Sequence, residues 1–132
     1  MKAINWKEWL MEARQYEDAG AGKGGVASKL SPVVVYNLFS MSLESYCMAI
    51  LDYHGTLADN HTFTDLMDSM EKVYSVEPEL KRRILELEKY QQICAFEDFI
   101  VAEVDSIINR EFQDVVGIFG EIARTECRVA AA

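Results

Sequence analysis

The chain has 132 residues, of which 50% are apolar and 27% are charged, and these proportions exclude wholesale disorder. A chain of this length makes one domain, so we expect a single unit over residues 1–132. The longest run without a charged residue, Leu30 to Leu43, is shorter than the roughly 20 apolar residues of a membrane span. Residues 1–10 already carry two lysines and a glutamate, unlike the apolar core of a signal peptide. We therefore predict no membrane association and a cytoplasmic location.

The charge balance and the cysteines argue against further classes of function. Thirteen basic and 22 acidic residues give a net charge of −9, which repels a phosphate backbone, so nucleic-acid binding is not expected. The cysteines, Cys47, Cys94 and Cys127, form no CxxC pair, and the sequence has no Glu-x-x-His motif of the kind that holds metals in helical bundles. We predict free thiols, no bound metal and no cofactor.

Apolar residues spaced three and four apart predict helices along the chain. The first helix is expected over Asn5–Asp18, and a flexible Gly-rich loop follows at about residues 19–30. Pro32, preceded by the capping residue Ser31, begins a second helix that continues to about Tyr53. This second helix is so apolar that we place it at the centre of a bundle.

Further helical segments follow. A third helix is expected after a cap at Asn60 or Thr62 and before Pro78, a fourth over 79–94 and a last one over 98–125. No alternating strand pattern accompanies them. The predicted fold is all-α, an up-and-down antiparallel bundle of four to five helices. The expected core residues are Phe39, Tyr46, Ile50, Leu66, Ile84, Ile107 and Phe119.

Some large apolar residues fall outside or at the edge of the stripes that form this core. Contiguous exposed apolar patches usually mark association sites, and a two-fold dimer is the commonest way to cover one. We therefore predict a homodimer. Its expected interface residues are Val33, Val34, Met41 and Met48 on the second helix and Phe99, Val101 and Val116 on the last helix.

The histidines suggest an alternative function. His54 and His61 flank the break after the second helix, and Asp65 follows closely. A pocket formed by these three side chains could hold a small ligand or a nucleotide, or could serve an enzyme. No P-loop and no nucleophile elbow is present, so we assign no catalytic residue.

Several residues follow an order found in a known family. In chain order, and with a Gly-rich loop after the first two, they are Trp9, Ala13, Glu44, Ala49, Gly55, His61 and Leu66. This order resembles the HEPN family (higher eukaryotes and prokaryotes nucleotide-binding) over roughly Trp6 to Phe119. The penultimate helix of that family often ends in an Arg-Tyr pair, where this sequence has Ala95 and Phe96.

The resemblance implies a helical bundle that commonly dimerises and that is frequently paired with a small nucleotidyltransferase in toxin–antitoxin modules. Active members are RNases with an Arg-x(4-6)-His motif. This chain has no such motif, because Arg14 lies far before His54 and every other arginine, Arg110 included, follows both histidines. We therefore expect a non-catalytic HEPN-like association module, with a nucleotidyltransferase as the candidate second protein.

Overall fold

The structure, a computed structural model, describes residues 5–22, 30–58, 60–94 and 104–129. These residues form α-helices and one 3-10 helix and contain no β-strand, which confirms the predicted all-α bundle. The helices are α1 Trp6–Gly20, α2 Pro32–Tyr53, α3 Phe63–Met70, α4 Pro78–Leu87 and α5 Ser106–Val129, and the 3-10 helix η2 spans Glu88–Cys94.

Capping side chains mark the residues at which α2 and α3 begin. Ser31 accepts a hydrogen bond from the amide of Val34 at 3.3 Å, directly before Pro32, so α2 starts where the sequence predicts. Of the two caps expected for α3, Thr62 is the one used, and its hydroxyl accepts from the amide of Asp65.

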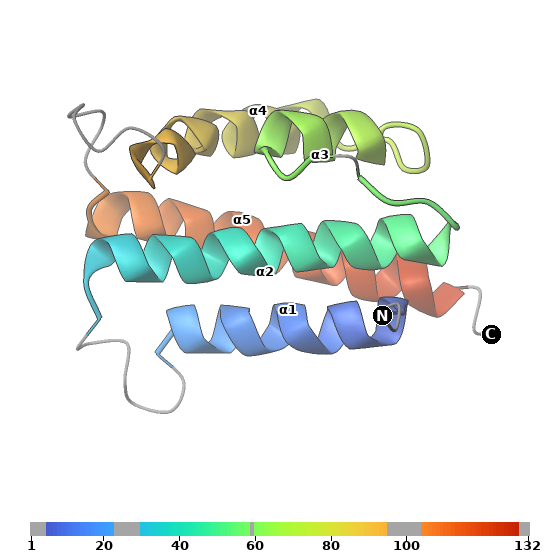
Figure 1. Cartoon of the computed structure of the whole chain (residues 1–132), viewed down its shortest axis with the longest axis horizontal. Coiled ribbons are helices and arrows are strands. Elements are labelled where there is room, and N and C mark those ends of the chain that lie inside the picture. Colours follow the sequence, from blue (N-terminus) through green and yellow to red (C-terminus); the bar gives the residue numbers. More distant parts are fainter. Residues whose placement is uncertain (1–4, 23–29, 59, 95–103, 130–132) are drawn as a thin grey trace.

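α2 and α1 run in opposite directions. Gly20 at the end of α1 lies against the Phe39 ring near the start of α2, and the Trp6 and Tyr53 rings meet edge to face at the other end, with centroids 5.5 Å apart. In Figure 1, α1 lies on one side of α2 and α5, and α3 and α4 form a layer on the other side.

α2 and α5 run in the same direction. Near the start of both helices, Nδ2 of Asn109 donates to the carbonyl of Pro32 at 2.9 Å, and near their ends the thiol of Cys127 lies 3.8 Å from the carbonyl of Ala49. α2 and α5 therefore form a parallel pair at the centre of the bundle, and α1 lies antiparallel to α2 beside them (Figure 1).

An aromatic cluster joins three helices in the core. The Phe112 ring of α5 lies 5.1 Å from Tyr36 and 5.9 Å from Phe39 of α2, and 5.8 Å from Phe63 of α3. All four rings are at most 2% exposed. Of the seven expected core residues, the buried ones are Phe39, Tyr46, Ile50, Leu66, Ile84 and Phe119.

The buried side of α5 includes Phe119 as predicted, but it excludes one edge of the expected apolar stripe. Ile107 and Ile118 are 68% and 38% exposed, so the prediction that Ile107 lies in the core is wrong. The buried side includes Gly120 instead, where a Cβ would lie 2.9 Å from Cζ of Tyr46. Small residues bring α2 close to this side of α5, and that contact sets the rotation of the helix.

Some helix ends differ from the prediction. The third helix ends at Met70 rather than just before Pro78, and the fourth changes to a 3-10 helix after Leu87. α1 continues to Gly20, so the predicted loop begins later. Residues 23–29 of that loop, and the predicted start of the last helix at 98, lie outside the described residues.

α2 is long and apolar enough to cross a membrane by length and composition, and no other helix in the described part of the chain is. Glu44, which limits the charge-free run of the sequence, lies inside this helix. Core helices of soluble proteins pass the same test, and 56% of the apolar window of α2 is buried within the bundle. The property is therefore weak evidence for a membrane span.

Candidate functional site

The three residues expected to share a pocket do not all meet. His54 caps the C-terminus of α2, and its Nε2 lies 3.4 Å from Oε1 of Glu126 on α5. His61, in the connection between α2 and α3, pairs with Glu44 of α2. Asp65 is in the first turn of α3. Only His61 and Asp65 line a common hollow.

That hollow lies at the N-terminal end of α3 and has a volume of about 630 Å³. The residues that line it all have polar side chains: Asn60, His61, Thr62, Thr64, Asp65, Glu88 and Gln91. It offers two carboxylates but no lysine or arginine, so it favours ligands that donate hydrogen bonds or carry positive charge.

The backbone amides at the start of α3 are already bonded within the chain. Each of the first three amides donates to a side-chain oxygen at 3.2 Å or less, in the pairs Phe63–Gln91, Thr64–Glu88 and Asp65–Thr62. A helix N-terminus binds anions through free amides. This one is therefore closed to a phosphate or carboxylate ligand unless the side chains move.

The geometry also opposes an RNase site built from Arg110. Arg110 is near the start of α5, whereas His54 pairs with Glu126, sixteen residues further along the same helix. That spacing corresponds to about 24 Å along the helix axis. The two side chains are too far apart to act on one phosphodiester. Within the described residues, no three metal-ligating side chains gather either.

The predicted interface residues have three different outcomes. Val33, Val34 and Met41 are 40%, 42% and 42% exposed. Met48 and Val116 are only 5% and 0% exposed, so the prediction that they face a second copy is wrong. Met48 is covered because residues 45–51 of α2 are buried on every side. Phe99 and Val101 lie outside the described residues.

The three exposed residues lie on one side of α2, which we call the α2 face, with the exposed Asn37 between Val33 and Met41 along the helix. Because each residue turns a helix by about 100°, Val33, Val34 and Met41 fall within about one third of the circumference. Tyr36 and Phe39, which contact Phe112 of α5, lie on the opposite side of the helix. The α2 face therefore points away from α5.

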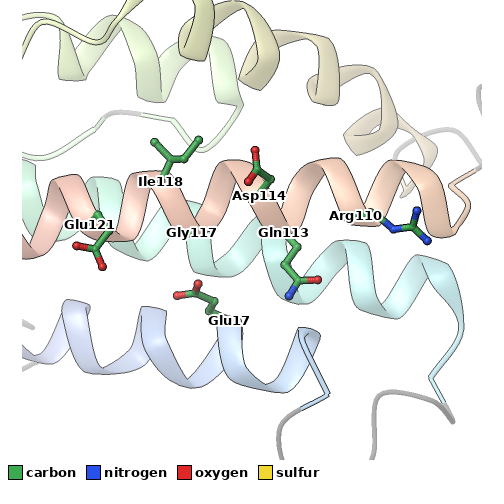
Figure 2. A pocket seen from close by; sticks show the side chains of 7 residues that line it. All are labelled: Glu17, Arg110, Gln113, Asp114, Gly117, Ile118 and Glu121. Carbon is green, nitrogen blue, oxygen red and sulfur yellow. The ribbon is translucent and has the colours of Figure 1, made fainter.

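A second hollow, of about 690 Å³, lies between α1 and α5. Figure 2 shows Arg110 at one end and Glu121 at the other, with Gly117 between them and Glu17 of α1 nearby. Residues 110, 114, 117 and 121 are spaced four, three and four apart, so the sequence alone places them on one side of a helix.

Beside this hollow, one hydroxyl connects three helices. Tyr46 of α2 donates to Oε1 of Glu17 at 2.6 Å and accepts from Nη1 of Arg124 at 3.2 Å, and Arg124 also donates to Glu121. Burial, followed by the hydrogen bond to Glu17, raises the pKa of Tyr46 to about 12. The phenol stays protonated at neutral pH, so it acts as a structural link and not as a base.

The thiols do not provide a nucleophile. Cys47 and Cys127, the cysteines whose side chains the structure describes, are free and buried. Burial raises the pKa of the Cys47 thiol well above its ordinary range and that of Cys127 to about 11. Because the thiolate is the reactive form, both groups are inert at neutral pH.

Comparison of the chain with protein-family models, with curated proteins and with solved structures finds no match.

Proposed function

We propose that the chain is a non-catalytic, HEPN-like association module that forms a homodimer through the α2 face. The observation that carries this proposal is the exposure of Val33, Val34 and Met41, at 40–42%, on one side of one helix. No charged residue interrupts the chain from Leu30 to Leu43. An uncovered aliphatic surface of this kind gains free energy when it is buried, at about 25 cal/mol for each Å².

A second copy related by a two-fold axis can cover this face. If the axis crosses α2 at Asn37, the two helices run antiparallel, and Met41 of one copy lies against Val33 and Val34 of the other. Each copy then covers the exposed aliphatic residues of its neighbour, so one self-complementary patch is sufficient.

Sedimentation equilibrium at about 10 µM protein tests the proposal. We expect a mass of about 30 kDa for the wild type, which is twice the 15.0 kDa of the chain. Val34→Glu should give the monomer mass, because it places an unpaired charge in the interface. Gln15→Glu adds the same charge at an exposed position of α1 and should leave the dimer intact. A wild type that is monomeric at about 100 µM contradicts the proposal.

The proposal includes a second protein as a cytoplasmic partner. This protein is the small nucleotidyltransferase that the HEPN resemblance implies. Its test is co-expression with the product of any adjacent nucleotidyltransferase gene, followed by co-purification. A separate, stable dimer that never retains that protein contradicts this part alone.

A ligand-binding role is the second candidate, because His61 and Asp65 do share the hollow of about 630 Å³. Its acceptor groups suit a polyamine or a polyol. Titration with spermidine and with ribose, followed by the NMR signals of the Thr64 and Asp65 amides, tests this role. Shifts that Asp65→Asn reduces would support it, and unchanged signals at about 10 mM of both probes would reject it.

A further inference from the structure

Another hollow, of about 360 Å³, lies at the end of the bundle where α2 and α5 begin and α1 ends. Its wall on α5 is polar and consists of Ser106, Asn109, Arg110 and Gln113. Its other wall is apolar and includes Leu30, Val35 and Phe39. The hollow therefore suits a small molecule that has an apolar body and polar groups on one side.

The Asn109 side chain has an acceptor atom without a partner. Asn109 is 8% exposed, and its Nδ2 donates to the carbonyl of Pro32 at 2.9 Å. Because a carbonyl can only accept, this bond fixes the orientation of the side-chain amide. Oδ1 is buried and has no hydrogen-bond partner among the described residues. An unpaired buried acceptor destabilises the fold, and a donor from a molecule in the hollow that Asn109 lines would remove that cost.

Arg110, the next residue of α5, is the only cationic residue among the described residues that line this hollow. Its guanidinium is exposed and forms no ion pair or hydrogen bond with another described residue. Figure 2 shows this side chain at one end of α5, away from Glu121. A guanidinium without a partner can bind both oxygens of a carboxylate.

The parallel arrangement of α2 and α5 adds to the positive potential of this hollow. Each helix N-terminus carries about half a positive charge, and both lie at this end of the bundle. The C-terminus of α1 contributes the opposite sign, and Asp105 caps α5 by accepting from the amide of Ile108 at 2.9 Å. No carboxylate is among the described residues that line the hollow itself, so its charges favour an anion.

We propose that this hollow binds a small organic carboxylate that has an apolar body and a hydroxyl group. The carboxylate pairs with Arg110, the hydroxyl donates to Oδ1 of Asn109, and the apolar body contacts Val35. Inorganic phosphate lacks the apolar body, and a simple fatty acid lacks the hydroxyl donor. Neither of those molecules uses all three features of the hollow.

This binding site goes beyond the homodimer of the proposed function. Pro32 and Phe39, which line the hollow, lie on the opposite side of α2 from Met41, because each residue turns a helix by about 100°. A homodimer through the α2 face therefore does not cover the hollow. The site also differs from the hollow at the start of α3, which has two carboxylates and no arginine.

Four probes separate the three features in NMR titrations of the full chain. The isomers 3-hydroxybenzoate and 4-hydroxybenzoate have both polar groups at different separations, benzoate lacks the hydroxyl, and 4-methylphenol lacks the carboxylate. The signals followed are those of the Asn109 side-chain amide and the Val35 methyl groups. We expect the tighter hydroxybenzoate to bind with a Kd of about 1 mM or below, at least tenfold more tightly than benzoate or 4-methylphenol.

Two variants assign the polar contacts. Arg110→Gln should weaken the tighter hydroxybenzoate and benzoate at least tenfold and leave 4-methylphenol unchanged. Lys72→Gln removes the same charge at an exposed position outside the hollow and should leave all probes unchanged. In Asn109→Ala, the hydroxybenzoate and benzoate should bind equally, because Oδ1 no longer accepts from the hydroxyl. Circular dichroism checks the fold of each variant, and the comparison of the two probes in the wild type needs no variant.

The outcomes separate this inference from the proposed function. The carboxylate site is overturned if neither hydroxybenzoate gives a saturable shift at about 20 mM, or if the wild type binds benzoate as tightly as both isomers. It is also overturned if Lys72→Gln acts like Arg110→Gln. Each of these results leaves the α2 homodimer unaffected. A wild type that is monomeric at about 100 µM and still prefers a hydroxybenzoate contradicts the homodimer alone.

Discussion

Tyr46 is completely buried, yet its hydroxyl bonds two charged side chains on different helices. Hydrogen bonds to charged groups each contribute about 1.5–3 kcal/mol, so Tyr46→Phe should lower the free energy of unfolding by about that amount. Tyr16→Phe is the matched control, because its hydroxyl makes one 3.4 Å contact with Glu12 and is only partly buried. We expect less than about 0.5 kcal/mol for the control. Urea unfolding compares the two, and equal losses would contradict the role of the Tyr46 network.

The raised pKa of Tyr46 predicts a loss of stability at high pH. A tyrosine in the unfolded chain loses its proton near the ordinary value of 10.0, whereas folded Tyr46 keeps it until about 12. Between these values the folded state binds more protons than the unfolded state, so the free energy of unfolding falls as pH rises. The contribution is complete below pH 10. Urea unfolding from pH 9 to 12 should show a steeper decline for the wild type than for Tyr46→Phe, and parallel curves would contradict it.

Alanine substitutions at the two glycines of α5 should change the free energy of unfolding in opposite directions. At Gly120 a Cβ would lie 2.9 Å from Cζ of Tyr46, whose ring is buried and cannot move aside, so Gly120→Ala should cost about 1–3 kcal/mol. At Gly117 the nearest atom is 3.9 Å away, so Gly117→Ala should stabilise the monomer by up to about 1 kcal/mol. Thermal unfolding at low protein concentration measures both, and changes of the same sign would contradict the packing described for α5.

The sequence predicts helices well where local chemistry determines them. Ser31 and Pro32 locate the start of α2 because a cap and a fixed φ act within one turn. The rotation of α5 depends instead on its contact with α2 through Gly120, which lies against the Tyr46 ring. Small residues contribute little to an apolar stripe, so a search for large aliphatic residues places Ile107 in the core and Val116 at an interface, the reverse of what the structure shows.

At the scale of the whole molecule, the all-α bundle follows from the sequence, but the direction of α5 relative to α2 does not. The three-and-four spacing of apolar residues predicts each helix but not the direction in which one helix runs relative to another. For the same reason the sequence places His54, His61 and Asp65 together by their proximity along the chain. The structure directs His54 to Glu126 on α5 and leaves only the other two in one hollow.

The proposed function rests on one uncovered surface of the molecule, the α2 face, where Val33, Val34 and Met41 are 40–42% exposed. The central claim is that copies of this chain meet through the α2 face.

Isotope-filtered NMR on a dimer of one labelled and one unlabelled copy tests that claim most directly. The account predicts intermolecular contacts from the Met41 methyl group to the methyl groups of Val33 and Val34 at about 100 µM protein. It also predicts that these contacts disappear in Val34→Glu. Intermolecular contacts that arise only from Ile107 and Ile118 on α5, or no intermolecular contacts at all, would contradict it.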